Sequence, residues 1–224
     1  MAPKRSSSYQ MSALPVTMFG HLVAVAVITL VLLWLLHFRD GLAFKSDNKD
    51  KIFNLHPLLM VLGLVLISGE AIMTYKTVPA TRKRQKLFHL LLHMIALVAG
   101  IIGIYAVFKF HYELGIPDMY SLHSWLGMST ICLFGLQWVL SFFSFWYPRA
   151  QQSTRARIAP WHAVFGMVIF FMAILSAETG LMEKFIFLGL RRSQEALIVN
   201  FIGLLILLFA VSVGLGVLLP RNLN

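Results

Sequence analysis

Four histidines in this sequence have the residue type and the spacing of metal ligands. They are His56 in FNLHP, His89 in KLFH, His123 in YSLHSW and His162 in APWH, and each lies about one turn inside the start of a long apolar segment. Consecutive membrane segments run in opposite directions, so His56 and His123 are expected near one face and His89 and His162 near the other. Ionisable side chains are costly within a membrane and mark functional sites there.

Two imidazoles at each face suit axial ligation of haem iron, because the porphyrin fills the other four positions. A zinc site needs four protein ligands, or three and a water, and no acid or cysteine lies at the required depth. The sequence therefore predicts two non-covalent haem b groups, about 20 Å apart from helix rise and bilayer thickness. Such a pair would carry electrons across a membrane.

The sequence contains four further histidines. His93 follows His89 by four residues and shares its helix face, so spacing leaves open which of the two is the ligand. His21 and His37 are expected to be structural or interfacial, and His111 is a candidate for substrate contact.

Three polar residues within the apolar segments, Glu70, Gln137 and Glu178, have a structural interpretation. Glu70 and Glu178 favour helix–helix hydrogen bonds over a proton relay. The single cysteine, Cys132, excludes a CxxCH haem attachment and is expected to be a small core residue.

Composition predicts the elements that position these side chains. The chain has 224 residues, of which 58% are hydrophobic and 12% charged, whereas soluble domains average about 25% charged. Apolar stretches of about 20 residues span a bilayer. We predict one all-α transmembrane domain over 1–224, a six-helix bundle whose middle four helices hold the haems. The expected spans are about 14–37, 54–75, 87–108, 122–145, 161–182 and 196–219.

The distribution of basic residues predicts orientation. With the N-terminus inside, eleven Lys and Arg lie on the inner side and eight on the outer side, and the short loop 76–86 carries five of them. This asymmetry favours both termini in the cytoplasm. The basic inner rim would contact either anionic lipid headgroups or an anionic substrate. A nucleic-acid partner is excluded, because these residues lie in tight interhelical loops.

The segments FNLHPLLMVLGL, KLFHLLLH, MYSLHSWLG and APWH, in this order, resemble the cytochrome b-561 family of ascorbate-dependent transmembrane electron carriers. The similarity runs from about residue 50 to 185, and SQEALIVN extends it into the last span. The resemblance implies an outer haem held by His56 and His123 and an inner haem held by His89 and His162. It favours His89 over His93, which becomes a neighbour of the ligand.

The resemblance also implies two substrate sites. Cytoplasmic ascorbate, a monoanion, would bind a basic pocket of Arg82, Lys86 and Arg155, with Lys76 and Lys83 nearby. On the outer side, monodehydroascorbate or a ferric chelate would contact Phe110, His111 and Tyr120, with His111 placed to handle a proton. These residues are the implied catalytic and substrate-binding set.

One loop departs from the family pattern. Residues 147–157 read YPRAQQSTRAR where relatives tend to have a glycine-rich YPGG-type turn, so Arg149 either enlarges the inner pocket or contacts lipid headgroups. The expected activity is that of an ascorbate-dependent monodehydroascorbate or ferric reductase in an endomembrane or plasma membrane. A homodimer through the spans outside the haem-binding four is expected.

Two other functions agree less well with the sequence. A proton-coupled transporter would use the histidines as proton relays, but paired mid-span Gly/Pro breaks are missing from the middle spans. Pro57 and Pro160 are expected at helix starts, where proline is tolerated. A non-catalytic scaffold leaves the matched depths of the histidines unexplained. No GxGxxG or P-loop is present, so a reductase would need a small soluble donor or a separate protein.

Overall fold

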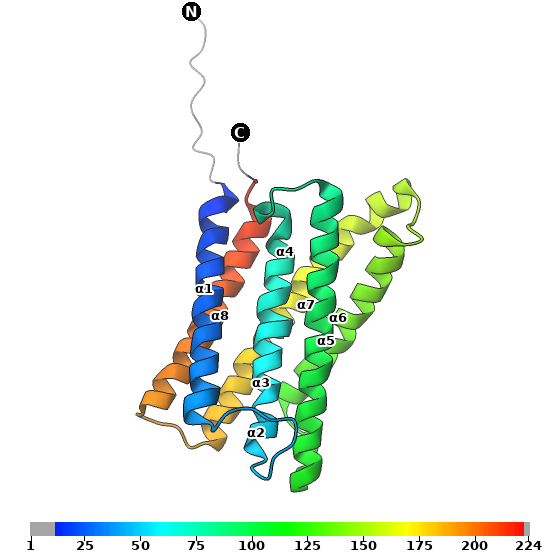
Figure 1. Ribbon diagram of the computed structural model, residues 1–224. Helices are drawn as coiled ribbons and strands as arrows, with labels where there is room; N and C mark the ends of the chain where they lie inside the picture. The colour runs from blue at the N-terminus through cyan, green and yellow to red at the C-terminus, as the bar shows by residue number, and fades with distance from the viewer. Residues whose placement is uncertain (1–11, 222–224) are drawn as a thin grey trace, which may run out of the picture.

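The computed structural model describes residues 12–221 and is helical throughout its regular elements, with no strand among these residues. Six helices are long and apolar enough to cross a membrane. They pack side by side as an elongated bundle (Figure 1). The prediction of an all-α, six-span fold is confirmed.

The six membrane helices contain eleven helical elements, three of them π-helical. The first is α1 (Ala13–Leu33) with η1 (Trp34–Phe38), and the second joins α2 (Asp50–Phe53), α3 (Leu55–Leu59), η2 (Met60–Ile67) and α4 (Ser68–Thr77). The third is α5 (Arg82–Leu114), and the fourth is α6 (Leu122–Ser141) with η3 (Phe142–Trp146). The last two are α7 (Gln152–Phe187) and α8 (Gln194–Leu218).

The helices are longer than the apolar segments that identify them, because their polar ends extend beyond the hydrophobic stretch. The clearest case is α7, which begins at Gln152 rather than near 161. Pro160 therefore lies inside α7, and its placement at a helix start is wrong. His89 and His162 lie near the start of their apolar segments, as predicted, but about two and three turns into the longer helices.

Polar caps fix where three helices begin. The Ser121 hydroxyl accepts a hydrogen bond from the Ser124 backbone N–H at 3.2 Å, and the Ser124 hydroxyl reciprocates at the Ser121 N–H. Ser193 caps α8 through the Ala196 N–H at 3.1 Å, and Thr81 caps α5. Such caps satisfy N–H groups that have no partner within the helix. The Ser121 cap makes His123 the second residue of α6.

Both described ends of the chain lie at one end of the bundle, shown at the top of Figure 1. The Ala13 N–H donates to the Pro220 carbonyl at 2.9 Å, and the Lys76 ammonium donates to the Leu219 carbonyl at 2.5 Å. We call this end, near Ala13, Thr77 and Leu218, the terminal face. The other end, near Phe38 and Phe187, is the opposite face.

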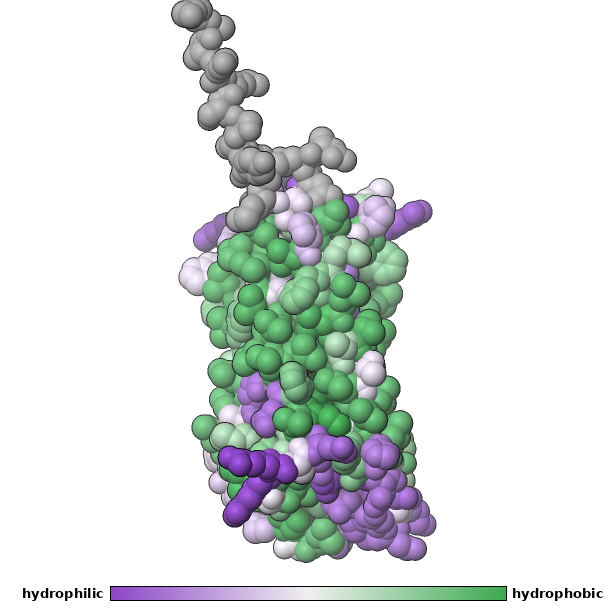
Figure 2. Space-filling view, turned by 90° about the vertical axis from the view of Figure 1, so that its left-hand side faces the viewer, coloured by the Kyte–Doolittle hydropathy of each residue, from purple (hydrophilic) through white to green (hydrophobic). Residues whose placement is uncertain are grey.

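The buried core lies between α1, α8 and the second membrane helix. Its largest fully buried side chains include Trp34, Leu35, Ile202 and Phe209. Figure 2 shows a broad apolar band between two polar ends on the side seen there, as expected for a surface in contact with lipid. Cys132 is exposed on the bundle surface, so its interpretation as a core residue is wrong.

The two acids within the spans differ. Glu70 on α4 pairs with His21 on α1, with Nδ1 2.9 Å from Oε1, which is the predicted helix–helix contact. The Glu178 Oε1 atom is buried without a hydrogen-bond partner among the described residues, and the predicted contact is not confirmed there.

Candidate metal centres

The first histidine pair lies near the opposite face. His56 of α3 and His123 of α6 have ring centres 6.0 Å apart and ring planes at 86°. The Nδ1 atom of His56 is 3.1 Å from the Gly103 carbonyl of α5, and that of His123 is 2.9 Å from the Ser176 carbonyl of α7. A carbonyl oxygen only accepts, so each Nδ1 carries the proton and each Nε2 is left to bind a metal.

The second pair lies nearer the terminal face and repeats this arrangement. His89 of α5 and His162 of α7 have ring centres 6.1 Å apart and ring planes at 73°. The His89 Nδ1–H donates to the Ala71 carbonyl of α4 at 2.9 Å. The His162 Nδ1 atom is 2.9 Å from the Ser141 hydroxyl of α6. Both separations agree with one metal between two imidazoles, since metal–nitrogen bonds of about 2 Å place the ring centres roughly 6 Å apart.

Each of the four central membrane helices supplies a histidine to one pair and a hydrogen-bond acceptor to the other. The second and third membrane helices exchange these bonds with each other, through Ala71 and Gly103. The fourth and fifth do the same through Ser141 and Ser176. We call these two antiparallel units the first hairpin (α3–α5) and the second hairpin (α6–α7). Each histidine pair joins one hairpin to the other.

His93 lies beside the second pair. Its ring centre is 4.4 Å from that of His89 and 5.4 Å from that of Phe134. His89 is the ring whose Nδ1–H is bonded to a carbonyl and whose centre lies 6.1 Å from His162. The geometry therefore favours His89 as the ligand and makes His93 its neighbour.

Glycines make room around the first pair. A Cβ atom on Gly180 of α7 would lie 2.6 Å from Cε1 of His123, so only glycine allows this ring position. A cavity of about 440 Å³ surrounds His56 and His123 and extends toward the opposite face. Its deeper wall is apolar, as a flat macrocycle requires. The polar residues at its mouth include His111, Asp118, Tyr120, Glu183 and Lys184.

The structure brings the three implied acceptor-site residues together at this mouth. Phe110 is buried and its ring centre is 5.1 Å from that of Phe53. The His111 Nδ1–H donates to Oδ1 of Asp118 at 2.7 Å, and Tyr120 is exposed. The Asp118 carboxylate holds the imidazole so that Nε2 is left for a ligand.

The implied ascorbate residues lie at the terminal face. Lys86 precedes His89 by one helical turn, and the charges of Arg149 and Arg155 act on its ammonium group. Arg82 is exposed, with its guanidinium 5.6 Å from the centre of the Tyr75 ring. Arg155 also donates to the Ala150 carbonyl at 2.6 Å. These cations form one basic surface beside the second pair.

Two further residues bear on that surface. Arg149 has a φ of 75°, a left-handed conformation that glycine adopts more readily, as expected if the family pattern has glycine at this turn. Lys76 is bonded to the Leu219 carbonyl at the end of α8. It anchors that helix, and it lies close enough to Arg82 for their charges to interact, so its predicted position near the pocket agrees with the structure.

Comparison with known sequences decides the family. The sequence model described as eukaryotic cytochrome b561 matches residues 55–188, which contain both histidine pairs. The chain belongs to the cytochrome b561 family. Members are b-type cytochromes, so the cytochrome b561 chain described here binds haem b.

Relatives of this cytochrome b561 carry names that describe electron transfer. The "Probable ascorbate-specific transmembrane electron transporter 1" of Oryza sativa subsp. japonica is 49% identical over 217 residues, covering 95% of this chain and 93% of the relative. The "Transmembrane ascorbate ferrireductase 2" of Arabidopsis thaliana is 44% identical over 92% of each chain. The "Transmembrane ascorbate-dependent reductase CYB561" of Ovis aries is 39% identical over 87% of this chain and 78% of the relative.

The residues present in this cytochrome b561 fit haem b. Each pair offers two opposed imidazoles, carbonyl groups fix the tautomers of His56, His89 and His123, and the first pair is bordered by an apolar cavity. Sequence reasoning missed the four acceptors of the Nδ1 protons, because three are backbone carbonyls and carry no residue signature. It also missed Asp118, whose spacing from His111 depends on the turn at Gly115 (φ 68°) that ends α5.

Proposed function

We propose that this cytochrome b561 carries electrons from ascorbate across a membrane through two haems b. His56 and His123 hold one haem, and His89 and His162 hold the other. The observation that carries this proposal is the repetition of one arrangement at both ends of the same four helices. Each pair has a ring separation near 6 Å and an Nδ1 hydrogen bond on every ring.

The terminal face is proposed to be cytoplasmic, with ascorbate bound there by Arg82, Lys86 and Arg155. Ascorbate is a monoanion at neutral pH, and a cluster of cations that repel one another is stabilised by an anion. Lys86 lies one turn from His89, so the cluster would hold ascorbate close to the second pair. The names of the relatives support ascorbate as the donor.

The bundle fixes the separation of the two centres. On α5, His89 and Gly103 belong to different centres and are 14 residues apart, which corresponds to about 21 Å of helix. On α7, His162 and Ser176 have the same spacing. Bound haem supplies the one-electron chemistry. The chain orients both pairs, excludes water between them and binds the donor at one end.

The acceptor is proposed to bind at the opposite face, against Phe110, His111 and Tyr120 around the cavity mouth. Reduction of monodehydroascorbate consumes one electron and one proton, and Nε2 of His111 is placed to deliver that proton, with Asp118 holding Nδ1. A ferric chelate, which needs only the electron, is the alternative acceptor. The homodimer and the choice of endomembrane or plasma membrane stay predictions.

The deciding experiment is a difference spectrum of the detergent-purified protein, ascorbate-reduced minus oxidised, with haem quantified per chain. We expect two b-type haems per chain, largely reduced by ascorbate. One haem per chain would refute the two-centre assignment. A colourless protein from haem-supplemented cells would refute electron transfer and favour a proton-coupled transporter.

A further inference from the structure

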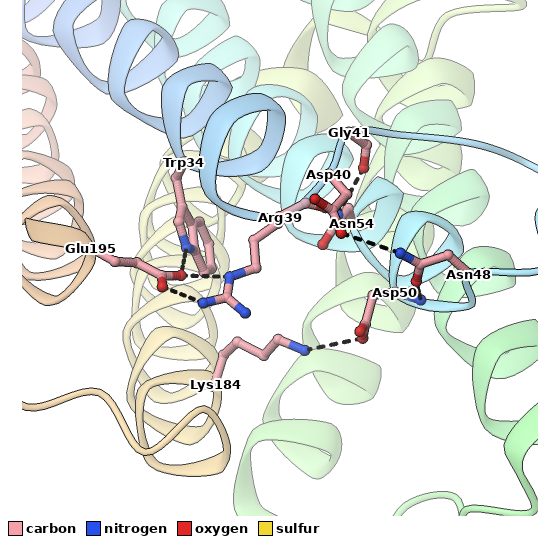
Figure 3. Close-up of polar contacts among 9 residues, drawn as sticks. All are labelled: Trp34, Arg39, Asp40, Gly41, Asn48, Asp50, Asn54, Lys184 and Glu195. Atoms are coloured by element: carbon pink, nitrogen blue, oxygen red, sulfur yellow. Dashed lines mark hydrogen bonds and ion pairs between the residues drawn. The ribbon is translucent and has the colours of Figure 1, made fainter.

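One cation inside the cavity of the first pair has no role in the function proposed above. Lys184 lies in the last turn of α7, its side chain is 14% exposed, and it lines the same cavity as His56 and His123. Figure 3 shows the side chain extended toward Asp50. A charge this far from water needs a partner of opposite sign.

The acids around Lys184 supply little compensation. Asp50 Oδ1 is 4.0 Å from the ammonium, at the limit of an ion pair, and the Asp50 side chain is 63% exposed, so water screens it. Glu195 is bound by Arg39 through both carboxylate oxygens and accepts from the Trp34 indole N–H at 2.8 Å (Figure 3). Glu183 adjoins Lys184 in α7 and also lines the cavity.

The ammonium is close to the candidate metal centre. Its nitrogen lies 3.9 Å from the centre of the Phe53 ring, and that ring centre lies 6.1 Å from the centre of the His56 ring. The two separations place the ammonium no more than about 10 Å from His56. The Phe53 ring also holds the cation in place through a cation–π contact.

We propose that Lys184 is the anion-binding residue of the opposite-face centre, that it takes a carboxylate or enolate anion, and that its charge raises the reduction potential of that centre. This inference rests on the proposed function. The anion has two possible sources, a propionate of the bound haem or an anionic acceptor such as monodehydroascorbate. Adding an electron to the centre adds negative charge, and a nearby cation stabilises that state.

The test is a redox titration, followed by haem absorbance, of purified holoprotein carrying Lys184→Met, whose side chain has similar length. The control is Lys49→Met, because Lys49 pairs with Glu113 at 2.7 Å and lines a separate shallow pocket on the same face. The redox transition of the opposite-face centre is identified as the one that disappears from the titration of the His123→Ala variant. If the unmodified protein gave no redox transition, the proposed function itself would fail. That outcome is distinct from an unshifted transition in Lys184→Met, which concerns Lys184 alone.

A unit charge about 10 Å away, at an effective dielectric constant of about 20, changes a one-electron equilibrium by roughly tenfold. Lys184→Met should therefore lower the opposite-face potential by about 59 mV, which is the equivalent of a tenfold change. The other centre and Lys49→Met should be unchanged. An unchanged potential together with an unchanged KM for monodehydroascorbate would overturn the proposal.

The two sources of the anion give different results. A propionate partner predicts faster loss of haem to an apoprotein trap in addition to the shift in potential, with an unchanged KM for monodehydroascorbate. An acceptor partner predicts a several-fold higher KM for monodehydroascorbate and unchanged haem loss. If Lys184→Met purifies without haem, Lys184→Arg and Lys184→Gln replace it. Retention of haem only with arginine supports the proposal, and loss with both overturns it.

Discussion

The hydrogen bond between the His162 Nδ1–H and the Ser141 hydroxyl offers the sharpest test of how the centres are built. It involves the one Nδ1 acceptor among the four that is a side chain, so Ser141→Ala removes it without altering the backbone. An imidazole without this partner can rotate or adopt the other tautomer, which places the proton on Nε2 and blocks metal binding. The expected effect is weaker haem binding at the His89–His162 centre alone.

The magnitude follows from the burial of the bond. Leaving a buried donor unpaired costs about 1–3 kcal/mol, and this bond is only partly buried. We therefore expect about 1–2 kcal/mol, which corresponds to a roughly 5- to 30-fold faster haem loss. This range overlaps the roughly 10- to 100-fold losses of metal affinity that follow removal of such partners in metal sites.

The assay is the rate of haem transfer from purified protein to an apoprotein trap, resolved into two phases. Ser129→Ala is the matched control, because Ser129 is an exposed serine of the same helix. Ser141→Thr should retain most of the unmodified behaviour, since it keeps the hydroxyl. Equal rates for Ser141→Ala and Ser129→Ala, in both phases, would refute the view that this bond orients His162.

Three other variants test the site. His123→Ala should lose one haem per chain and keep the other, and His162→Ala should lose the complementary one, as measured by haem content and by the reduced spectrum. Lys86→Ala should slow reduction by ascorbate about tenfold, the effect of losing one charge in a partly screened site, with an unchanged dithionite-reduced spectrum. Gly180→Ala should selectively weaken haem binding at the opposite-face centre, because its Cβ atom would lie 2.6 Å from the His123 ring. The control Gly135→Ala should leave haem binding unchanged, because the nearest atom to its Cβ would be 3.7 Å away.

Each of these predictions has an outcome that contradicts it. Loss of the same haem from His123→Ala and His162→Ala would mean that the histidine pairs are wrongly assigned. Ascorbate kinetics unaffected by Lys86→Ala would argue against the basic surface as the donor site. Equal haem retention in the Gly180 and Gly135 variants would show that the His123 ring has room to move.

The sequence was sufficient to predict the six membrane helices and which histidines share a face. Both predictions depend on hydropathy and on the reversal of direction between successive spans, which follow directly from residue order. The start of α7 at Gln152 was not predicted. Hydropathy identifies only the part of a helix that lies in lipid and does not detect a polar extension beyond it. The same limit explains the incorrect placement of Pro160 at a helix start.

Other features depend on three-dimensional packing. Cys132 was assigned to the core because an apolar helix in a membrane has no polar face to show which side points outward. The carbonyl groups of Ala71, Gly103 and Ser176 exist at every residue, so only the bundle selects them. Lys184 is one of the eight basic residues counted on the outer side, and only the bundle shows that the last turn of α7 directs it into the cavity.

The exchange of hydrogen bonds within each hairpin has a consequence for assembly. Every ligand ring is oriented by its own hairpin, through a bond that never crosses between α5 and α6. Each hairpin therefore orients its two ligand histidines without help from the other hairpin. Each of the two proposed haems would be held by one histidine from each hairpin. Binding of haem at either pair would therefore connect two hairpins that already hold their own ligand rings in place.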